Sequence, residues 1–117
     1  MKIKITKRFT FEMAHKLSSS YSKECQNIHG HSYKLEVTLE SAIKEDGMIM
    51  DFKKLKELVN PIIVRFDHQY ITEKDFGMNP TAENMAVHIF NNLKKRIPIL
   101  YSVKLWETEN SFVEVSW

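Results

Sequence analysis

The sequence predicts an α+β domain in which two helices cover one face of a four-stranded antiparallel sheet, with its elements in the order ββ-α-α-ββ. Two observations support this prediction. Apolar and polar side chains alternate near both ends of the 117-residue chain, whereas apolar residues between these segments recur every three to four positions. Alternation is typical of strands with one buried face, and the three-to-four spacing is typical of amphipathic helices.

Two long strands are expected at the start of the chain. From Ile3 to Leu17 the odd positions are mostly apolar and the even positions are polar or charged, so the odd side chains should face the core. A second strand from about His29 to Ser41 repeats this pattern, with polar residues 18–27 between the two. We expect the two strands to form an antiparallel hairpin.

Two helices are expected after the hairpin. The first carries an apolar stripe over residues 52–66, begins at an Asp51 cap and should kink or be interrupted at Pro61. The second should begin at Thr81 and run towards Arg96. Two further strands follow, and their expected inward face holds four residues: Tyr101, Val103, Leu105 and Glu107.

Composition limits the class of protein. Hydrophobic residues make up 43% of the chain and charged residues 27%, a balance typical of globular proteins, and nothing marks a boundary within residues 1–117, so we expect one domain. No apolar run approaches the roughly 20 residues that span a bilayer, and the N-terminus does not resemble a signal peptide. A single cysteine and a net charge of +2 favour a reducing cytoplasm and no nucleic-acid partner.

Three histidines are candidate metal ligands. His29 and His31 share one side of the second strand, and His15 lies near the end of the first, beside the same loop. In an antiparallel hairpin their rings would converge, and three neutral imidazoles leave a fourth zinc position open for water or substrate. Two histidines spaced by one residue are a weak signal alone, and a bulge could turn His15 away.

Four other residues are candidates for proton transfer or binding. Cys25 could be a fourth zinc ligand, a nearby base or an idle thiol. Asp67 and His68 could form an oriented proton carrier, or a simple turn. Glu107 continues an apolar face, where a carboxylate needs a partner such as two adjacent N–H groups of a ligand; alternatively it faces solvent at the strand end.

Several motifs in order resemble the 6-pyruvoyl tetrahydropterin synthase superfamily over essentially the whole chain: FEMAHKL (11–17), CQNIHGH (25–31), GMIMDF (47–52), DH (67–68), PTAEN (80–84) and ET (107–108). The short gap between Cys25 and His29 is similar to that of the bacterial-type 6-carboxytetrahydropterin synthases of the queuosine pathway. Thr72 departs from the family, which commonly has asparagine near this position.

The resemblance implies the tunnelling fold, subunits joined into a barrel, and a homohexamer with active sites between subunits. It also implies that Cys25 is the proton-abstracting base, that Asp67 and His68 complete a proton relay, and that Glu107 anchors the pterin. The positions that match the zinc ligands are His15, His29 and His31.

The implied reaction converts 7,8-dihydroneopterin triphosphate into 6-carboxytetrahydropterin, acetaldehyde and triphosphate. Lys16 is a weak candidate for binding the triphosphate. Two alternatives remain at this point: a 6-pyruvoyl tetrahydropterin synthase, which eliminates triphosphate without cleaving the side chain, and a noncatalytic zinc- or pterin-binding module.

Overall fold

A long antiparallel hairpin organises the structure, a computed structural model that describes residues 1–17 and 27–117. Strands β1 (Ile3–His15) and β2 (His29–Ser41) each have 13 residues and pair without a break from Ile3↔Ser41 to His15↔His29. The odd-numbered side chains of both strands lie on the more buried face, as the alternation predicts. The expected first strand is confirmed except for its last two residues.

The other strands extend the hairpin on both sides. β4 (Leu100–Thr108) pairs antiparallel with β2, and β5 (Ser111–Ser116) pairs antiparallel with β4. β3 (Gln69–Ile71) pairs in parallel with β1, which gives the order β3-β1-β2-β4-β5. The α+β class is therefore confirmed, but the predicted four-stranded, wholly antiparallel sheet is one strand short. β3 has only three residues, too few to display alternation.

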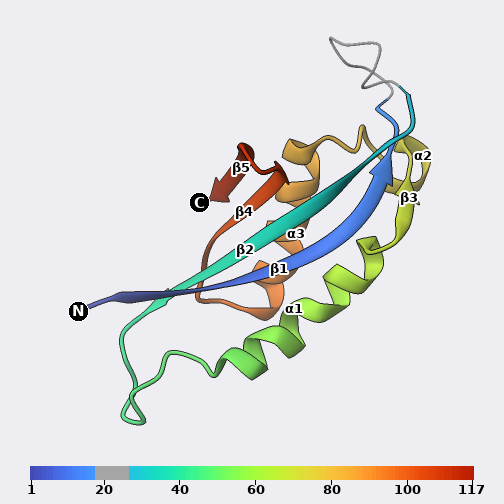
Figure 1. The fold of residues 1–117 in the computed structure, drawn as a ribbon. Coiled ribbons are helices and arrows are strands. Elements are labelled where there is room, and N and C mark those ends of the chain that lie inside the picture. The colour runs from blue at the N-terminus through green and yellow to red at the C-terminus, as the bar shows by residue number, and fades with distance from the viewer. Residues whose placement is uncertain (18–26) are drawn as a thin grey trace.

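The two long helices pack on one face of the sheet (Figure 1). They are α1 (Phe52–Phe66) and α3 (Ala82–Arg96), and a four-residue helix, α2 (Glu73–Phe76), lies between them in the chain. As predicted, Asp51 caps α1 by accepting a hydrogen bond from the Lys53 N–H at 2.7 Å, and Thr81 caps α3.

Helix α1 is continuous through Pro61, so the predicted interruption was wrong, and the alternative, a kink at Pro61, stays a prediction. Pro61 lies on the exposed side of the helix, where a carbonyl that has lost its helical partner can bond to water. The apolar stripe around Pro61 packs into the core and holds the helix on both sides of the ring; its buried members are Leu55, Val59, Ile62, Ile63 and Phe66.

A register shift alters the first half of β4. Thr38 pairs with Ser102, but Leu39 pairs with Leu100, so one residue is extra on the β4 side. The prediction that Tyr101 faces inward was wrong, because the bulge turns its ring outward to 40% exposure, with the Lys4 ammonium 3.8 Å from the ring centroid. Beyond the bulge, Val103 and Leu105 are fully buried, and the next odd-numbered residue, Glu107, also lies on the inward face.

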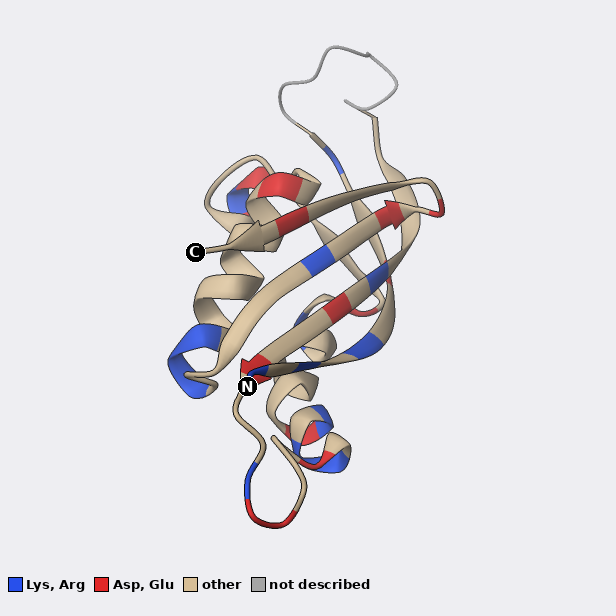
Figure 2. Ribbon diagram, turned by 90° about the vertical axis from the view of Figure 1, so that its left-hand side faces the viewer, with Lys and Arg blue, Asp and Glu red and all other residues tan. Residues whose placement is uncertain are grey.

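The face of the sheet away from the helices is polar and carries both signs of charge. Figure 2 shows basic and acidic residues interspersed along neighbouring strands. Among them, Glu36 lies 3.6 Å from Arg8 and also accepts a hydrogen bond from the Trp106 indole. Among the described residues, no helix is long and apolar enough to cross a membrane.

Helix α1 offers a matched test of core packing. Val59 is fully buried and Val64 is 63% exposed on the same helix. We expect Val59→Ala to lower the free energy of unfolding by about 2 kcal/mol, because it removes buried methyl groups and leaves a small cavity. Val64→Ala should change it by less than about 0.5 kcal/mol. Urea denaturation followed by circular dichroism measures both, and equal effects would contradict the assigned facing of α1.

Candidate active site

The three histidines predicted as metal ligands lie together at the end of the hairpin. Cross-strand pairing places His15 opposite His29 and Met13 opposite His31, so all three imidazoles project from the helix-covered face. One ligand nitrogen from each ring lies within 4.8 Å of the others. The ring centroids are 4.4 to 5.4 Å apart. The convergence predicted from parity and strand pairing is therefore present in the folded chain.

Carbonyl groups fix the tautomers of two of these rings. His15 Nδ1 lies 2.9 Å from the Pro80 carbonyl oxygen, and His29 Nδ1 lies 2.8 Å from the Asn27 carbonyl oxygen. A carbonyl oxygen only accepts hydrogen bonds, so each Nδ1 carries the proton and donates it. In the neutral rings, each Nε2 therefore presents a lone pair, as metal-binding histidines do.

Those two lone pairs face each other, since the Nε2 atoms of His15 and His29 are only 2.8 Å apart. A cation between them, either a proton or a metal ion, removes the repulsion. Burial lowers the pKa of His15 to about 4, which disfavours the proton at neutral pH. The Nε2 of His31 is also buried and lacks a hydrogen-bond partner among the described residues. This donor set fits a metal ion that prefers nitrogen ligands.

Glu107 approaches the histidines from β4. Its Oε1 lies 3.7 Å from His31 Nε2, and its side chain is 31% exposed. Burial lowers the pKa of His31, while the Glu107 carboxylate opposes that shift. Glu107 also lines a cavity of about 170 Å³ with residues of α3 and β5. Its inward position agrees with the sequence parity, and its partly open carboxylate is available to a ligand beside the histidines.

Asp67 and His68 form a second group at the edge of β1. The main chain of Glu12 holds both residues: its N–H donates to Asp67 Oδ1 at 2.9 Å, and its carbonyl accepts from the His68 N–H at 2.6 Å. His68 has a positive φ of 58°, a conformation that is uncommon outside glycine but that histidine adopts more often than most residues. Its Nδ1 lies 3.1 Å from Asp67 Oδ1, so the carboxylate can orient the ring, and the role of the pair in proton transfer stays a prediction.

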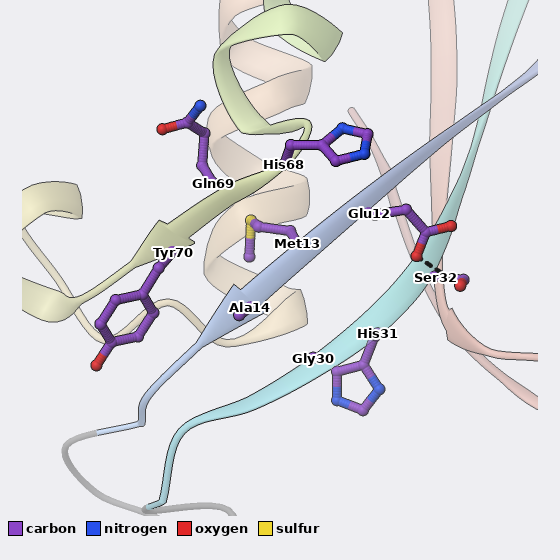
Figure 3. A pocket seen from close by; sticks show the side chains of 9 residues that line it. All are labelled: Glu12, Met13, Ala14, Gly30, His31, Ser32, His68, Gln69 and Tyr70. Carbon is purple, nitrogen blue, oxygen red and sulfur yellow. Dashed lines mark hydrogen bonds between the residues drawn. The ribbon is translucent and has the colours of Figure 1, made fainter.

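Within one chain the two groups are not in contact. Figure 3 shows His68 and His31 on opposite sides of β1, although both line an open pocket of about 460 Å³. No hydrogen bond, ion pair or ring contact joins Asp67 or His68 to the three histidines in the described part of the chain. The His68 side chain is 79% exposed, so it is presented to solvent.

Three other sequence predictions have different outcomes. Cys25 lies outside the described residues, so its predicted role as base or ligand stays a prediction. Thr72 caps α2 in a capping box: its hydroxyl accepts a hydrogen bond from the Asp75 N–H, and the Asp75 carboxylate accepts one from the Thr72 N–H. The residue that departs from the family therefore stabilises the start of α2. Lys16 contributes a main-chain hydrogen bond to Ile71, and its role toward phosphate stays a prediction.

The sequence predictions missed three contributors to the site. The Pro80 carbonyl and the Glu12 main chain carry no side-chain signal, so only the folded chain shows that they hold His15 and Asp67. Tyr33 did have a signal, because it follows His31 on the same face of β2 and brings a hydroxyl to an apolar surface. Its oxygen lies 3.3 Å from His15 Nδ1.

Comparison with known proteins identifies the family. The family model for 6-pyruvoyl tetrahydropterin synthase matches residues 4–116, so the chain belongs to that family of pterin synthases. The resemblance inferred from the sequence motifs is confirmed. A solved 6-pyruvoyl tetrahydropterin synthase from Caenorhabditis elegans superposes with a TM-score of 0.89 at 27% identity, covering 100% of this chain and 96% of that one.

Relatives with different named activities are similarly close in sequence. The 6-carboxy-5,6,7,8-tetrahydropterin synthase of Haemophilus influenzae is 37% identical over 137 residues, covering 95% of this chain and 96% of the relative. The dihydroneopterin monophosphate aldolase of Pyrococcus furiosus is 36% identical over 120 residues, covering 100% of both. The 6-pyruvoyl tetrahydrobiopterin synthase of Dictyostelium discoideum is 37% identical over 126 residues, covering 93% of this chain and 92% of the relative. Family membership alone therefore leaves the product undecided.

Removing one of the three histidines should abolish tight metal binding. We expect the purified protein to hold about one zinc per chain and His31→Ala to lose most of it, because two imidazoles bind zinc far more weakly than three. His88→Ala is the matched control, since His88 packs against Phe76 and Arg65 outside the cluster. Metal analysis after dialysis measures both; full zinc occupancy in His31→Ala would contradict the assignment.

The Asp67 contact should appear in the pH dependence of stability. Because Asp67 accepts the Glu12 N–H, its pKa in the folded chain lies below the ordinary value of 3.8. The folded state then favours the carboxylate, so the stabilisation is present above that value and is lost as the pH falls through the folded pKa. The stability advantage of wild type over Asp67→Asn should therefore be constant near neutral pH and shrink as the pH falls below about 5, with the slope expected for the titration of one carboxylate. An advantage independent of pH would contradict this account.

Proposed function

We propose that the chain is a zinc-dependent 6-carboxytetrahydropterin synthase. It would convert 7,8-dihydroneopterin triphosphate into 6-carboxytetrahydropterin, acetaldehyde and triphosphate, a step of queuosine and related 7-deazapurine synthesis in the cytoplasm. The observation that carries the proposal is the cluster of His15, His29 and His31 with Glu107 beside it. The similarity to the Haemophilus influenzae enzyme and the short gap between Cys25 and His29 support the 6-carboxy branch.

The proposed roles follow from the chemistry of the side chains. Bound zinc would supply Lewis acidity toward the hydroxyl groups of the substrate side chain. Glu107 would accept two adjacent N–H groups of the pterin ring, which orients the ring and satisfies the partly buried carboxylate. Cys25, as a thiolate, would remove the carbon-bound proton, and His68 oriented by Asp67 would deliver a proton.

A complete site would need two subunits. Asp67 and His68 are held at the edge of β1, and among the described residues nothing joins them to the histidine cluster of their own chain. The exposed His68 ring faces outward. We therefore propose a homohexamer in which Asp67 and His68 of one chain act on a substrate held by the zinc and Glu107 of its neighbour. A separated subunit would then bind zinc but turn over no substrate.

Three other functions remain alternatives. A 6-pyruvoyl synthase would use the same residues without breaking the side-chain carbon–carbon bond. An aldolase acting on dihydroneopterin monophosphate is favoured by the full-length similarity to the Pyrococcus furiosus enzyme, and a carbon–carbon cleavage is common to that reaction and the 6-carboxy reaction. A noncatalytic pterin-binding module would retain the metal and Glu107 without turnover.

Product analysis separates these four functions. The zinc-loaded protein is incubated separately with dihydroneopterin triphosphate and dihydroneopterin monophosphate, and the products are identified by mass spectrometry. We expect acetaldehyde and 6-carboxytetrahydropterin from the triphosphate. A pyruvoyl product without acetaldehyde would indicate the 6-pyruvoyl reaction, and glycolaldehyde phosphate from the monophosphate would indicate an aldolase. Absence of turnover with both substrates would favour the noncatalytic module.

Cys25→Ala tests the proposed base. Because the thiol is proposed to move a proton and not to hold the metal, the variant should retain zinc and lose turnover by at least about 100-fold. Metal analysis and the product assay are measured on the same sample. Wild-type turnover in Cys25→Ala would remove the thiol from the mechanism, and loss of zinc would make it a ligand.

Complementation between inactive variants tests the shared site. His31→Ala lacks a metal ligand and His68→Ala lacks the proton carrier, so each should be inactive alone. After joint unfolding and refolding, about a quarter of the sites should combine an intact cluster with an intact His68 if subunits associate at random. Mixing His31→Ala with the double variant H31A/H68A is the control and should restore nothing. No recovery in the first mixture would contradict a site shared between subunits.

A further inference from the structure

Tyr33 is a fully buried tyrosine beneath the histidine cluster. It lies on β2, two residues after His31 and on the same face, and is 0% exposed. A buried phenol normally has a polar partner for its hydroxyl group. Phenylalanine would fill nearly the same space without needing a hydrogen-bond partner, so we expect the buried hydroxyl group to have a function.

The hydroxyl group of Tyr33 is directed at the metal site. Its oxygen lies 3.3 Å from Nδ1 of His15, the nitrogen that donates to the Pro80 carbonyl at 2.9 Å. The phenol oxygen is thus a second, longer acceptor for the same N–H, an arrangement known as a three-centre hydrogen bond. Burial and the negative charge of Glu107 both raise the pKa of Tyr33, so the phenol stays neutral.

Packing holds the Tyr33 ring in one orientation. The ring stacks on Phe11 with centroids 5.1 Å apart and planes 8° from parallel, and Phe11 in turn stacks on Phe66. The edges of His15 and His31 meet Tyr33 at centroid distances of 6.2 and 5.7 Å. Rotating the phenol would require several buried rings to move together, so the position of its oxygen is well determined.

We propose that Tyr33 is a positioning residue of the metal site, whose hydroxyl holds the His15 ring together with the Pro80 carbonyl and so strengthens metal binding. The inference rests on the metal site of the proposed function. The Pro80 carbonyl fixes the tautomer, and the second acceptor restricts the rotation of the ring, which keeps Nε2 aimed at the other two histidines. Outer hydrogen bonds of this kind typically change metal affinity by 10- to 100-fold.

Tyr33→Phe removes the oxygen and keeps the ring, while Tyr101→Phe is the matched control on the exposed face of β4. Zinc affinity is measured by competition with a chromophoric chelator, and thermal unfolding of the metal-free proteins reports on folding. We expect Tyr33→Phe to bind zinc at least about 10-fold more weakly, whereas Tyr101→Phe matches wild type. Both metal-free variants should unfold at similar temperatures, because the Pro80 carbonyl still satisfies Nδ1.

A second measurement separates positioning from a general loss of packing. Proton–nitrogen NMR of the metal-free protein should show His15 protonated at Nδ1 in both proteins, because the Pro80 carbonyl accepts that proton in each. The His15 ring signals should be sharp in wild type and broadened in Tyr33→Phe, where one acceptor alone holds the ring. Equal zinc affinity together with equally sharp His15 ring signals in Tyr33→Phe would overturn the inference. If wild type itself binds no zinc, the proposed metal site fails first, and the comparison of ring signals alone then decides whether Tyr33 orients His15.

Discussion

The register of one hairpin determines whether this chain has a metal site. Uninterrupted pairing from Ile3↔Ser41 places His15 opposite His29 after 13 residues on each strand. Because side chains alternate faces, a slip of one residue would move the second-strand histidines to the polar face, away from His15. The buried residues that fix the register, such as Leu35, Val37 and Leu39, lie further along the strands than the histidines but hold the histidines in place. The packing of the core therefore also determines the geometry of the histidine site.

Electrostatics at this end of the hairpin favour a cation in a specific way. Burial lowers the pKa of His15 and His31. The Nδ1 protons of His15 and His29 are donated to carbonyl groups, so in the neutral rings the two Nε2 lone pairs face each other. Glu107 adds a negative charge at the margin, 3.7 Å from His31. A divalent metal ion relieves both the lone-pair repulsion and the cost of a partly buried carboxylate. The unfavourable contacts of the metal-free cluster therefore favour the binding of an ion.

Patterned features could be predicted from the sequence, and features that depend on main-chain contacts could not. The strands, the caps at Asp51 and Thr81 and the convergence of the histidines follow from periodicity and parity. The extra strand β3 and the bulge that turns Tyr101 outward are set by hydrogen bonds that any residue can make. The Pro80 carbonyl, which orients His15, likewise has no side-chain signature. Pro61 misled the prediction because packing on both sides of it outweighs the lost hydrogen bond.

The sheet also explains why one chain would make only part of an active site. A strand presents two faces and two edges, and this fold uses the helix-covered face for the histidines and the β3 edge of β1 for Asp67 and His68. The Glu12 main chain holds that pair at the edge, while Glu12 itself points to the polar face, where it accepts a hydrogen bond from Ser32. Moving His68 to the cluster of its own chain would break the two hydrogen bonds from the Glu12 main chain that hold Asp67 and His68. In the proposed assembly a second subunit would bring its own Asp67 and His68 to the cluster, and the Glu12 contacts of each chain would stay in place.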